Sequence, residues 1–335
     1  MGSDAAQTFT SVRAGLRRMQ ERPGLYACRP AKPALEQPAP LVASAITHLD
    51  ARARREGRPA EWLAFLAAQA FRDLERRARL SPADGARLGV FLALPARPGL
   101  GAEQRDELAY HFHNHAERDL LPAFEVSFGG HAAALAAAER AAAAVSSGRL
   151  GAAAVGAADS WLFRPWLEAA DADWRLLCPR NPDGFQPGEA AAFFLLEPAA
   201  DAARRGAAPL AHLGGSAAAR RDASKGLPDA GAALASAVGE LLRPGAGPVF
   251  VCDLNGEARR AKEWALAVGR LGRRLEGGFA VEHPASVLGD VGAAAGAVQV
   301  ALAVQWLATK HAGRPAVVWA ASEDGERRAL ALERA

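Results

Sequence analysis

Cysteine and long hydrophobic stretches are scarce in this chain of 335 residues. The three cysteines, Cys28, Cys178 and Cys252, are widely spaced and odd in number, so the sequence predicts neither a disulfide framework nor a zinc site. No run of about 18 or more apolar residues is free of charges and helix breakers, so no membrane span is expected. The N-terminal segment lacks the apolar core and the cleavage signature of a signal peptide, which favours a cytoplasmic location.

Lysine is also rare, with four residues against thirty-six arginines. The formal net charge is only +3, and the isoelectric point is near 9.0. The arginines are scattered among acidic residues, and they form no basic stripe with interleaved aromatic side chains. A nucleic-acid partner is therefore not expected.

Alanine is abundant instead, with 83 residues. Half of the chain is hydrophobic and 23% is charged, a composition that permits a packed core and does not favour disorder. Because alanine fits helices and strands alike, composition alone does not predict the secondary structure. The length agrees with two domains of roughly 100–200 residues each.

The first half of the chain alternates between helix and strand patterns. Residues 51–80 have apolar side chains at a period near 3.6, which predicts an amphipathic helix. The apolar run 88–94 predicts a buried strand. Residues 99–119 are polar and have the composition of a loop, and residues 124–127 predict a short strand before a Phe-Gly-Gly sequence.

One pattern then occurs twice. A glycine-containing turn is followed by an Ala-rich helix at residues 131–146 and a small-residue strand at 152–158. In the second copy, a turn at 289–296 opens a helix that runs to about His311, and a strand follows at 316–320. Strands that alternate with helices favour parallel sheets, so the repeat predicts two α/β halves built on one plan.

The division between the halves is expected near the middle of the chain. We predict an N-terminal half at residues 1–198, a connection at 199–229 and a C-terminal half at 230–335. Another strand is predicted at 248–252, before the second copy of the repeat.

Three blocks of the sequence resemble the β-ketoacyl-acyl-carrier-protein synthases of the thiolase-like superfamily. Residues 181–197 (Asn-Pro-Asp-Gly-Phe-Gln-Pro-Gly-Glu and the strand pattern after it) are similar to the Arg-Asp-Gly-Phe-x-x-Gly-Glu-Gly-Ala segment of the family. Residues 131–159 resemble the helix, turn and strand that follow its nucleophile, and residues 288–296 resemble its Gly-His-x-x-Gly-Ala-Ala-Gly block. The resemblance covers the chain from about residue 83 onward and implies an α/β, thiolase-like duplicated fold with five layers, αβαβα.

The resemblance also implies where the chemistry would lie. In this family a cysteine at the turn from a strand into a helix attacks an acyl thioester, and two histidines assist decarboxylation and attack by the carbanion. A helix N-terminus favours a thiolate, and backbone N–H groups at the same turn bind an oxyanion. Ser127 stands at the position of the cysteine, and Asn255 and Asp290 stand at those of the histidines. Ala285 replaces a lysine and Gln299 an acidic residue.

The closing Gly-Phe-Gly-Gly-Thr-Asn loop of the family is replaced by residues 322–328. Because every chemical position differs while the scaffold blocks remain, we do not expect condensation by a Cys-His-His site. The resemblance instead implies a protein degenerate at the catalytic positions. No cofactor is expected.

Two functions stay open. The first is a non-condensing partner subunit, similar to a chain-length factor, that binds acyl carrier protein or acyl-CoA and forms a homodimer or a heterodimer with a ketosynthase paralogue. The second is an acyltransferase or thioester hydrolase with Ser127 as nucleophile, which a contact with His131 one helical turn away would assist. A helix-capping role for Ser127 is the alternative to catalysis.

Asn255, Glu257 and Asp290 are expected to face one pocket. There Asn255 would donate a hydrogen bond to a carbonyl, and the two carboxylates would act as acid or base. In the alternative interpretation, Asn255 and Gly256 form a turn and Asp290 caps the helix after it.

Two further patterns are weak. His111, His113 and His115 would share one face of an extended segment, but no second element supplies metal ligands, so no metal site is expected. The glycines of residues 289–296 do not have the spacing of a dinucleotide-binding loop.

Overall fold

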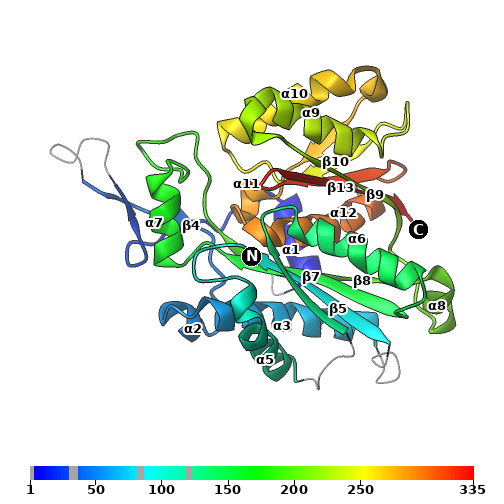
Figure 1. Ribbon diagram of the computed structural model, residues 1–335, viewed down its shortest axis with the longest axis horizontal. Coiled ribbons are helices and arrows are strands. Elements are labelled where there is room, and N and C mark those ends of the chain that lie inside the picture. Colours follow the sequence, from blue (N-terminus) through cyan, green and yellow to red (C-terminus); the bar gives the residue numbers. More distant parts are fainter. Residues whose placement is uncertain (1–3, 30–36, 81–86, 118–122) are drawn as a thin grey trace.

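The computed structural model describes residues 4–29, 37–80, 87–117 and 123–335 and shows two large β-sheets with helices between and outside them, besides the two-stranded pairs β1-β4 and β2-β3 (Figure 1). The N-terminal sheet has the strand order β6-β5-β7-β8. Its strands are β5 (Leu88–Pro95), β6 (Ala123–Gly129), β7 (Ala152–Ser160) and β8 (Glu189–Leu196). β5 runs parallel to both β6 and β7, and β8 is antiparallel to β7. β5 is buried along its whole length, which explains its continuous apolar sequence.

The C-terminal sheet has the strand order β11-β10-β12-β13-β9. Its strands are β9 (Ala211–Arg220), β10 (Val249–Cys252), β11 (Ala280–Glu282), β12 (Ala316–Ala321) and β13 (Glu326–Arg334). β10 is parallel to β11 and β12, whereas β13 is antiparallel to β12 and β9. Each half therefore has a parallel centre with antiparallel strands added on one side.

Two Ala-rich helices, α6 (Ala133–Ser146) and α12 (Ala295–Ala308), lie between the sheets (Figure 1). A Cβ atom added to Gly296 of α12 would lie 3.1 Å from the Cβ of Ala134 and from the Cγ of Leu135. The small side chains thus let the two helices approach closely in the middle of the molecule.

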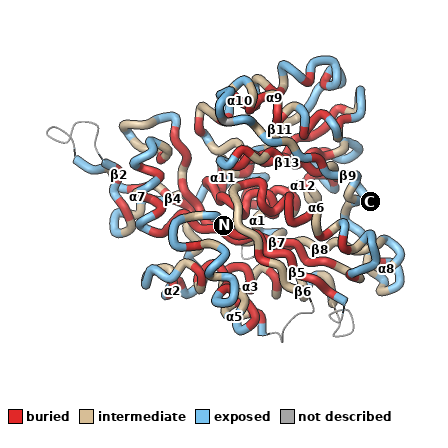
Figure 2. Tube along the Cα trace, viewed as in Figure 1, coloured by how far each residue is buried: buried red, intermediate tan, exposed pale blue. Residues whose placement is uncertain are grey.

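Within the described residues, a pair of helices covers the outer face of each sheet. α3 (Pro59–Ala78) and α5 (Arg105–Ala116) pack on the N-terminal sheet, and α9 (Gly226–Gly239) and α10 (Ala258–Leu271) pack on the C-terminal sheet (Figure 1). Buried apolar residues form one cluster on the outer face of each sheet and a third between the sheets. Buried residues therefore occur in every layer (Figure 2). The five-layered αβαβα fold is therefore confirmed.

Shorter elements complete the chain. They are α1 (Ala5–Arg13), β1 (Gln20–Glu21), β2 (Ala27–Cys28), β3 (Ala39–Pro40), β4 (Val42–Ala43), α2 (Arg52–Arg55), α7 (Arg164–Ala172), α8 (Ala199–Arg204) and α11 (Ala285–Leu288), with 3-10 turns η1 (Ala102–Gln104), η2 (Ala223–Lys225), η3 (Gly272–Leu275) and η4 (Gly292–Ala294).

The prediction of a loop at residues 99–119 is wrong, because α5 occupies most of it. The helix buries only Leu108, Phe112, His113 and Ala116. Three of these repeat every four residues, a stripe too narrow to stand out among the polar residues around it.

Because residues 105–116 form a helix, the three histidines do not point in the directions expected for an extended segment. His111 and His115 lie one turn apart with their rings stacked at 6.2 Å between centroids. His113 is buried, and its Nδ1 lies 2.7 Å from the carbonyl oxygen of Ala109. The expectation that all three share one face is therefore wrong.

The segment 199–229, expected to be a connection, contains α8, η2 and the whole of β9. β9 pairs with β13 over the length of both strands, so this segment contributes an edge strand to the C-terminal sheet. No helix in the described part of the chain combines the length and the apolar character that crossing a membrane requires.

Candidate functional site

The turn from β6 into α6 is where the resemblance leads us to expect a nucleophile. Ser127 does not lie there: it is inside β6, where it pairs with Ala93 of β5. His131 occupies the turn, two residues after the end of β6 and two before α6, and only 4% of its surface is exposed. The placement of Ser127 at the turn is therefore corrected.

Two consequences follow for Ser127. Because it belongs to a strand, the expected contact with His131 across one helical turn does not exist. Nor does Ser127 cap α6, because the N-cap position is Ala132. The signal that marks the turn in the sequence is Gly129-Gly130, directly before His131, because glycine pairs typically end a strand.

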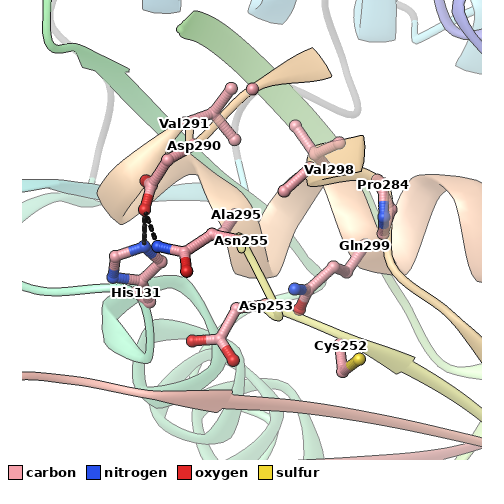
Figure 3. A pocket seen from close by; sticks show the side chains of 12 residues that line it. His131, Cys252, Asp253, Asn255, Pro284, Asp290, Val291, Ala295, Val298 and Gln299 are labelled. Atoms are coloured by element: carbon pink, nitrogen blue, oxygen red, sulfur yellow. Dashed lines mark hydrogen bonds and ion pairs between the residues drawn. The ribbon is translucent and has the colours of Figure 1, made fainter. Parts of the chain in front are cut away.

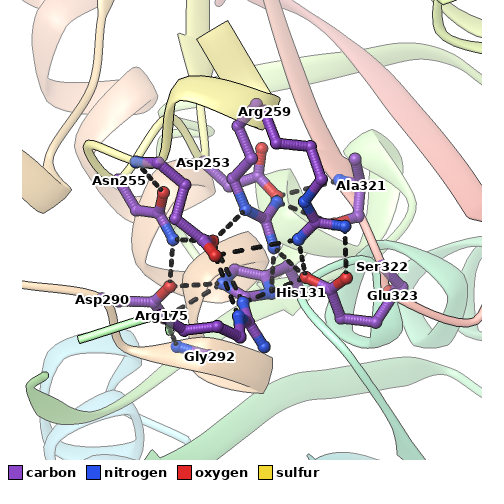
Figure 4. Close-up of polar contacts among 12 residues, drawn as sticks. His131, Arg175, Asp253, Asn255, Arg259, Asp290, Gly292, Ala321, Ser322 and Glu323 are labelled. Carbon is purple, nitrogen blue, oxygen red and sulfur yellow. Dashed lines mark hydrogen bonds and ion pairs between the residues drawn. The ribbon is translucent and has the colours of Figure 1, made fainter. Parts of the chain in front are cut away.

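Both ring nitrogens of His131 have partners (Figure 4). Nε2 lies 3.0 Å from each carboxylate oxygen of Asp290, and Nδ1 lies 3.1 Å from Nη2 of Arg260. A guanidinium only donates hydrogen bonds, so Nδ1 must accept. This network assigns the neutral imidazole with its proton on Nε2, donated to Asp290, and it leaves no lone pair of the ring free.

Asp290 is the centre of the site. Its Oδ1 accepts hydrogen bonds from the backbone N–H of Gly292 at 2.7 Å and from the indole N–H of Trp161 at 3.1 Å. Its Oδ2 accepts one from the amide of Asn255. Asp290 thus faces Asn255 and His131, as expected, and accepts from the turn before α12, but the N-cap positions of η4 and α12 are Val291 and Ala294.

Burial opposes the ionisation of Asp290, which is 1% exposed. The hydrogen bond from His131, the guanidinium of Arg260 and the amide of Asn255 outweigh this effect and hold the pKa of Asp290 well below its usual range. The carboxylate is therefore ionised and committed to its partners, which makes it a poor acid or base.

Arg260, at 5% exposure, joins the site to the C-terminal half. Burial disfavours its charge, but the surrounding carboxylates outweigh burial and raise its pKa. Its contacts are Asp253 Oδ2 (2.8 Å), the carbonyl of Ala321 (2.9 Å), His131 Nδ1 (3.1 Å), Glu323 Oε1 (3.1 Å) and Glu257 Oε2 (3.2 Å). Every nitrogen of the guanidinium is thus in use.

Glu257 belongs to this network, as the sequence predicts. Arg175 donates two hydrogen bonds to it, at 2.8 and 3.0 Å, and a third to Glu323 at 3.1 Å. The Asn255 amide also donates to Glu257, at 2.9 Å. Burial would raise the pKa of Glu257, but Arg175 and Arg260 outweigh it and lower the pKa, so this carboxylate is also ionised and paired.

A buried ion pair between Arg97 and Asp159 lies beside the network of Asp290. Arg97 binds Asp159 through two hydrogen bonds of 2.7 and 2.9 Å, and its guanidinium lies 3.6 Å from the ring centre of Trp161. Asp159 also accepts the backbone N–H of Ala293 at 2.8 Å. Only glycine fits at Gly292 between these groups, because its φ is +51° and a Cβ would lie 1.9 Å from an Asp159 oxygen.

The cavity beside these residues is small, about 20 Å³, which is room for about one water molecule (Figure 3). Asp253 and Gln299 line it, and Oδ1 of the first and Oε1 of the second are buried without a hydrogen-bond partner among the described residues. Burial raises the pKa of Asp253 in spite of Arg260. These acceptors suit a single water and leave no space for an acyl thioester.

Cys252 also lines this cavity, at the end of β10. Its thiol is fully buried, and it lies 3.6 Å from the carbonyl oxygen of Glu282. Burial strongly raises its pKa, so the thiolate that a nucleophilic cysteine needs is disfavoured.

The structure thus brings together four of the five predicted site residues, His131, Asn255, Glu257 and Asp290, and leaves Ser127 outside. Sequence reasoning missed Arg260 and Arg175. Arg260 follows the partly exposed Arg259 directly, and no sequence signal distinguishes the buried arginine from its neighbour. Arg175 precedes the block at 181–197 that carries the resemblance, and this position is the one available hint.

Comparisons with known proteins agree with this description. No family model matches the chain, and a search of curated proteins finds no significant match. Among solved structures, a chain of a type II PKS acyl-carrier protein in complex with its ketosynthase bound to the hexaketide (AntDE:AntF) has a TM-score of 0.76 and 16% identity, over 100% of this chain and 96% of that chain. The ishigamide ketosynthase/chain length factor has a TM-score of 0.69 and 22% identity, over 98% and 95%. The oxazolomycin ketosynthase domain KS7 of Streptomyces albus JA3453 has a TM-score of 0.73 and 16% identity, over 98% and 71%.

These likenesses extend over the whole chain at low sequence identity. What the chain shares with these structures is therefore its fold, namely the layers, sheets and central helices described above. The protein has the thiolase-like fold of the ketosynthases and the chain-length factor to which it is similar.

Proposed function

We propose that this protein is a non-condensing, ketosynthase-like subunit that acts beside a catalytically intact ketosynthase, in the manner of a chain-length factor. The observation that carries this proposal is the state of His131. It occupies the turn where a nucleophile would stand, and both of its nitrogens are held by Arg260 and Asp290.

The surroundings of His131 support the same conclusion. The backbone N–H of Ala132, at the turn where an oxyanion would bind, already donates to the Ser322 hydroxyl at 2.9 Å. The adjoining cavity has room for about one water molecule. A site with its donors paired and its space filled is suited to holding two halves of a protein together and not to turnover.

The partner would dock along β6. Among the described strands, β6 pairs with β5 alone, so its other edge is open to a further strand. Phe124 and Phe128 on β6 are partly exposed, and the Glu125–Arg140 ion pair lies beside them. An apolar edge with charges at its side fits the edge of a similar subunit. We propose a ketosynthase paralogue there, and acyl carrier protein or acyl-CoA as the source of the acyl chain.

The absence of acyl transfer can be tested directly. The protein is incubated with acyl-CoA and with acyl-carrier thioesters, and intact mass spectrometry measures covalent adducts, with an intact ketosynthase as positive control. We expect no adduct and no thioester hydrolysis for the wild-type protein or for Ser127→Ala. An adduct on Ser127 that disappears in Ser127→Ala would instead establish the acyltransferase or hydrolase.

The partner is tested by co-expression with a catalytically intact ketosynthase, followed by native mass spectrometry. We expect a one-to-one heterodimer that Phe128→Glu disrupts. Phe279→Glu is the matched control, because Phe279 is also partly exposed, at 38%, but precedes β11 at the edge of the other sheet. Recovery of only a monomer or of a dimer of identical chains would contradict the proposed partner.

A further inference from the structure

Two cysteines that are 150 residues apart in the sequence lie side by side in the structure. Cys28 ends β2, which pairs with β3, and the segment carrying it lies beside α7 (Figure 2). Cys178 opens a tight turn, in which its N–H donates to the carbonyl of Asn181 at 3.2 Å and its carbonyl oxygen accepts from the N–H of Asn181 at 2.9 Å. The spacing in the sequence gives no indication of this contact.

The two sulfur atoms and a carboxylate oxygen of Asp171 all lie within 4.8 Å of one another. The two thiols differ in accessibility, since Cys28 is 2% exposed and Cys178 is partly exposed. An oxidant therefore reaches Cys178 first. The sulfur of Cys28 lies near enough that a small movement of the side chains would bring the two sulfur atoms to the distance of a disulfide bond.

A metal ion fits this place poorly. The oxygens of Asp171 already accept hydrogen bonds from the Tyr26 hydroxyl at 2.9 Å, the Arg29 backbone N–H at 3.2 Å and the Arg180 guanidinium. The positive charge of Arg180 lies beside the thiols and would repel a cation. The three groups also fall short of the four ligands of a structural zinc site.

We propose that Cys28 and Cys178 form a reversible, oxidant-driven disulfide. Hydrogen peroxide oxidises the Cys178 thiol to a sulfenic acid and is itself reduced to water. The Cys28 thiol then attacks the Cys178 sulfur, the S–S bond forms, and the sulfenic oxygen leaves with two protons as a second water. Two electrons pass from the thiol pair to the peroxide, and a dithiol reductant returns them.

The order of these steps follows from the surroundings. Burial, together with the neighbouring Cys178, raises the pKa of the Cys28 thiol to about 12. Cys28 is therefore a poor first target for peroxide. Once Cys178 is a sulfenic acid, its sulfur is electrophilic and lies within 4.8 Å of the Cys28 sulfur, so the second step takes place between neighbouring groups.

The bond would fix a segment that reaches the central site. Arg175, three residues before Cys178, binds Glu257 and Glu323. After the turn, the chain continues to Pro187, which forms a β-bridge with Asp290. Oxidation would thus tie the N-terminal segment around Cys28 to the stretch that packs against the central site.

The experiment uses the full chain, reduced and then treated with a small excess of hydrogen peroxide. Free thiols are blocked with N-ethylmaleimide, and peptide mass spectrometry locates the modified cysteines. We expect a Cys28–Cys178 peptide that dithiothreitol reverses, while the buried Cys252 stays reduced as an internal control. Because the bond closes a loop of 150 residues, we also expect a rise in Tm of roughly 5 °C or more on oxidation.

Two variants separate the roles. In Cys28→Ala, Cys178 should still be oxidised but trapped as a sulfenic acid or mixed disulfide, and in Cys178→Ser no oxidation of Cys28 should occur. Three results would overturn the proposal: both thiols still react with the maleimide after peroxide, the bond joins two chains, or the reduced protein holds one zinc ion that Cys28→Ala loses.

Discussion

The central helices α6 and α12 have the same length, 14 residues, but they begin in different ways. At the start of α6, the N–H of Ala132 donates to Ser322, which comes from the C-terminal half. At the start of α12, the N–H of Ala293 donates to Asp159, which comes from the N-terminal half. Each helix is thus capped from the opposite half of the molecule.

The charge at the two turns differs as well. The turn before α12 carries ionised Asp290, which suits the positive end of a helix. The turn before α6 carries a neutral imidazole, and this imidazole is hydrogen-bonded to Asp290. The two duplicated turns are therefore joined by a hydrogen bond, with His131 as donor and Asp290 as acceptor.

The largest effect is expected when the link between the halves is removed. Arg260→Met leaves Asp253, Glu257 and His131 without their shared donor inside the protein. Breaking a buried network in this way costs about 3–5 kcal/mol of unfolding free energy, which chemical denaturation monitored by circular dichroism measures. The adjacent Arg259→Met is the control: Arg259 pairs with Glu323, but its side chain is 41% exposed, so we expect a loss below about 1 kcal/mol. Equal losses would show that the buried network does not join the halves.

A smaller effect is expected at the turn before α12. In Asp290→Asn, one acceptor oxygen becomes an NH2 group that faces the donors of Gly292 or Asn255, which costs about 1–3 kcal/mol at pH 7. Because the pKa of Asp290 is lowered in the folded state, its contribution is complete above the unfolded pKa of about 4 and is lost as the pH falls below it.

The variant should therefore show a shallower fall of unfolding free energy between about pH 4 and pH 2 than the wild type. Denaturant titrations at a series of pH values measure this slope. Asp173→Asn, at an exposed position after α7, is the control and should change stability by less than about 0.5 kcal/mol. If the unfolding free energy of Asp290→Asn fell with pH as steeply as that of the wild type, the ionised state of this carboxylate would be contradicted.

The smallest effect tests how closely the central helices approach. Gly269 in α10 has open space around it, so Gly269→Ala should stabilise the protein by up to about 1 kcal/mol through helix propensity. At Gly296 the added methyl group meets Ala134 and Leu135 at 3.1 Å, and the gain should be cancelled or reversed. Thermal unfolding compares the two variants, and equal stabilisation would show that the helices have room to spare.

Much of the fold was predictable from local patterns. Continuous apolar runs predicted β5 and β10, and repeated glycine and alanine spacing predicted the two central helices with the strands after them. α5 was missed because its buried stripe is formed by few residues among many polar ones. The strand β9 was missed because small and polar residues dominate its half-exposed sequence, and only its pairing with β13 makes it a strand.

The site was predictable in part. The resemblance implies that Asn255, Glu257 and Asp290 face one pocket, and the structure shows that they are hydrogen-bonded to one another through Asn255. Ser127 was placed one turn too early because the resemblance decided the alignment, although the local pattern already predicted residues 124–127 as a strand before Gly129 and Gly130.

The sequence by itself determined most of the helices and strands and their duplication, because hydrophobic periodicity and turn residues act over short stretches of chain, and the resemblance implied how they stack in layers. Only the tertiary structure decided which charges are buried and what they bind. Arg260 and Arg259 have the same chemistry and adjacent positions, yet one is enclosed by three carboxylates and an imidazole and the other faces solvent. Cys28 and Cys178 likewise become neighbours only when distant segments pack. Such contacts depend on the folded arrangement of several elements, and no local pattern encodes them.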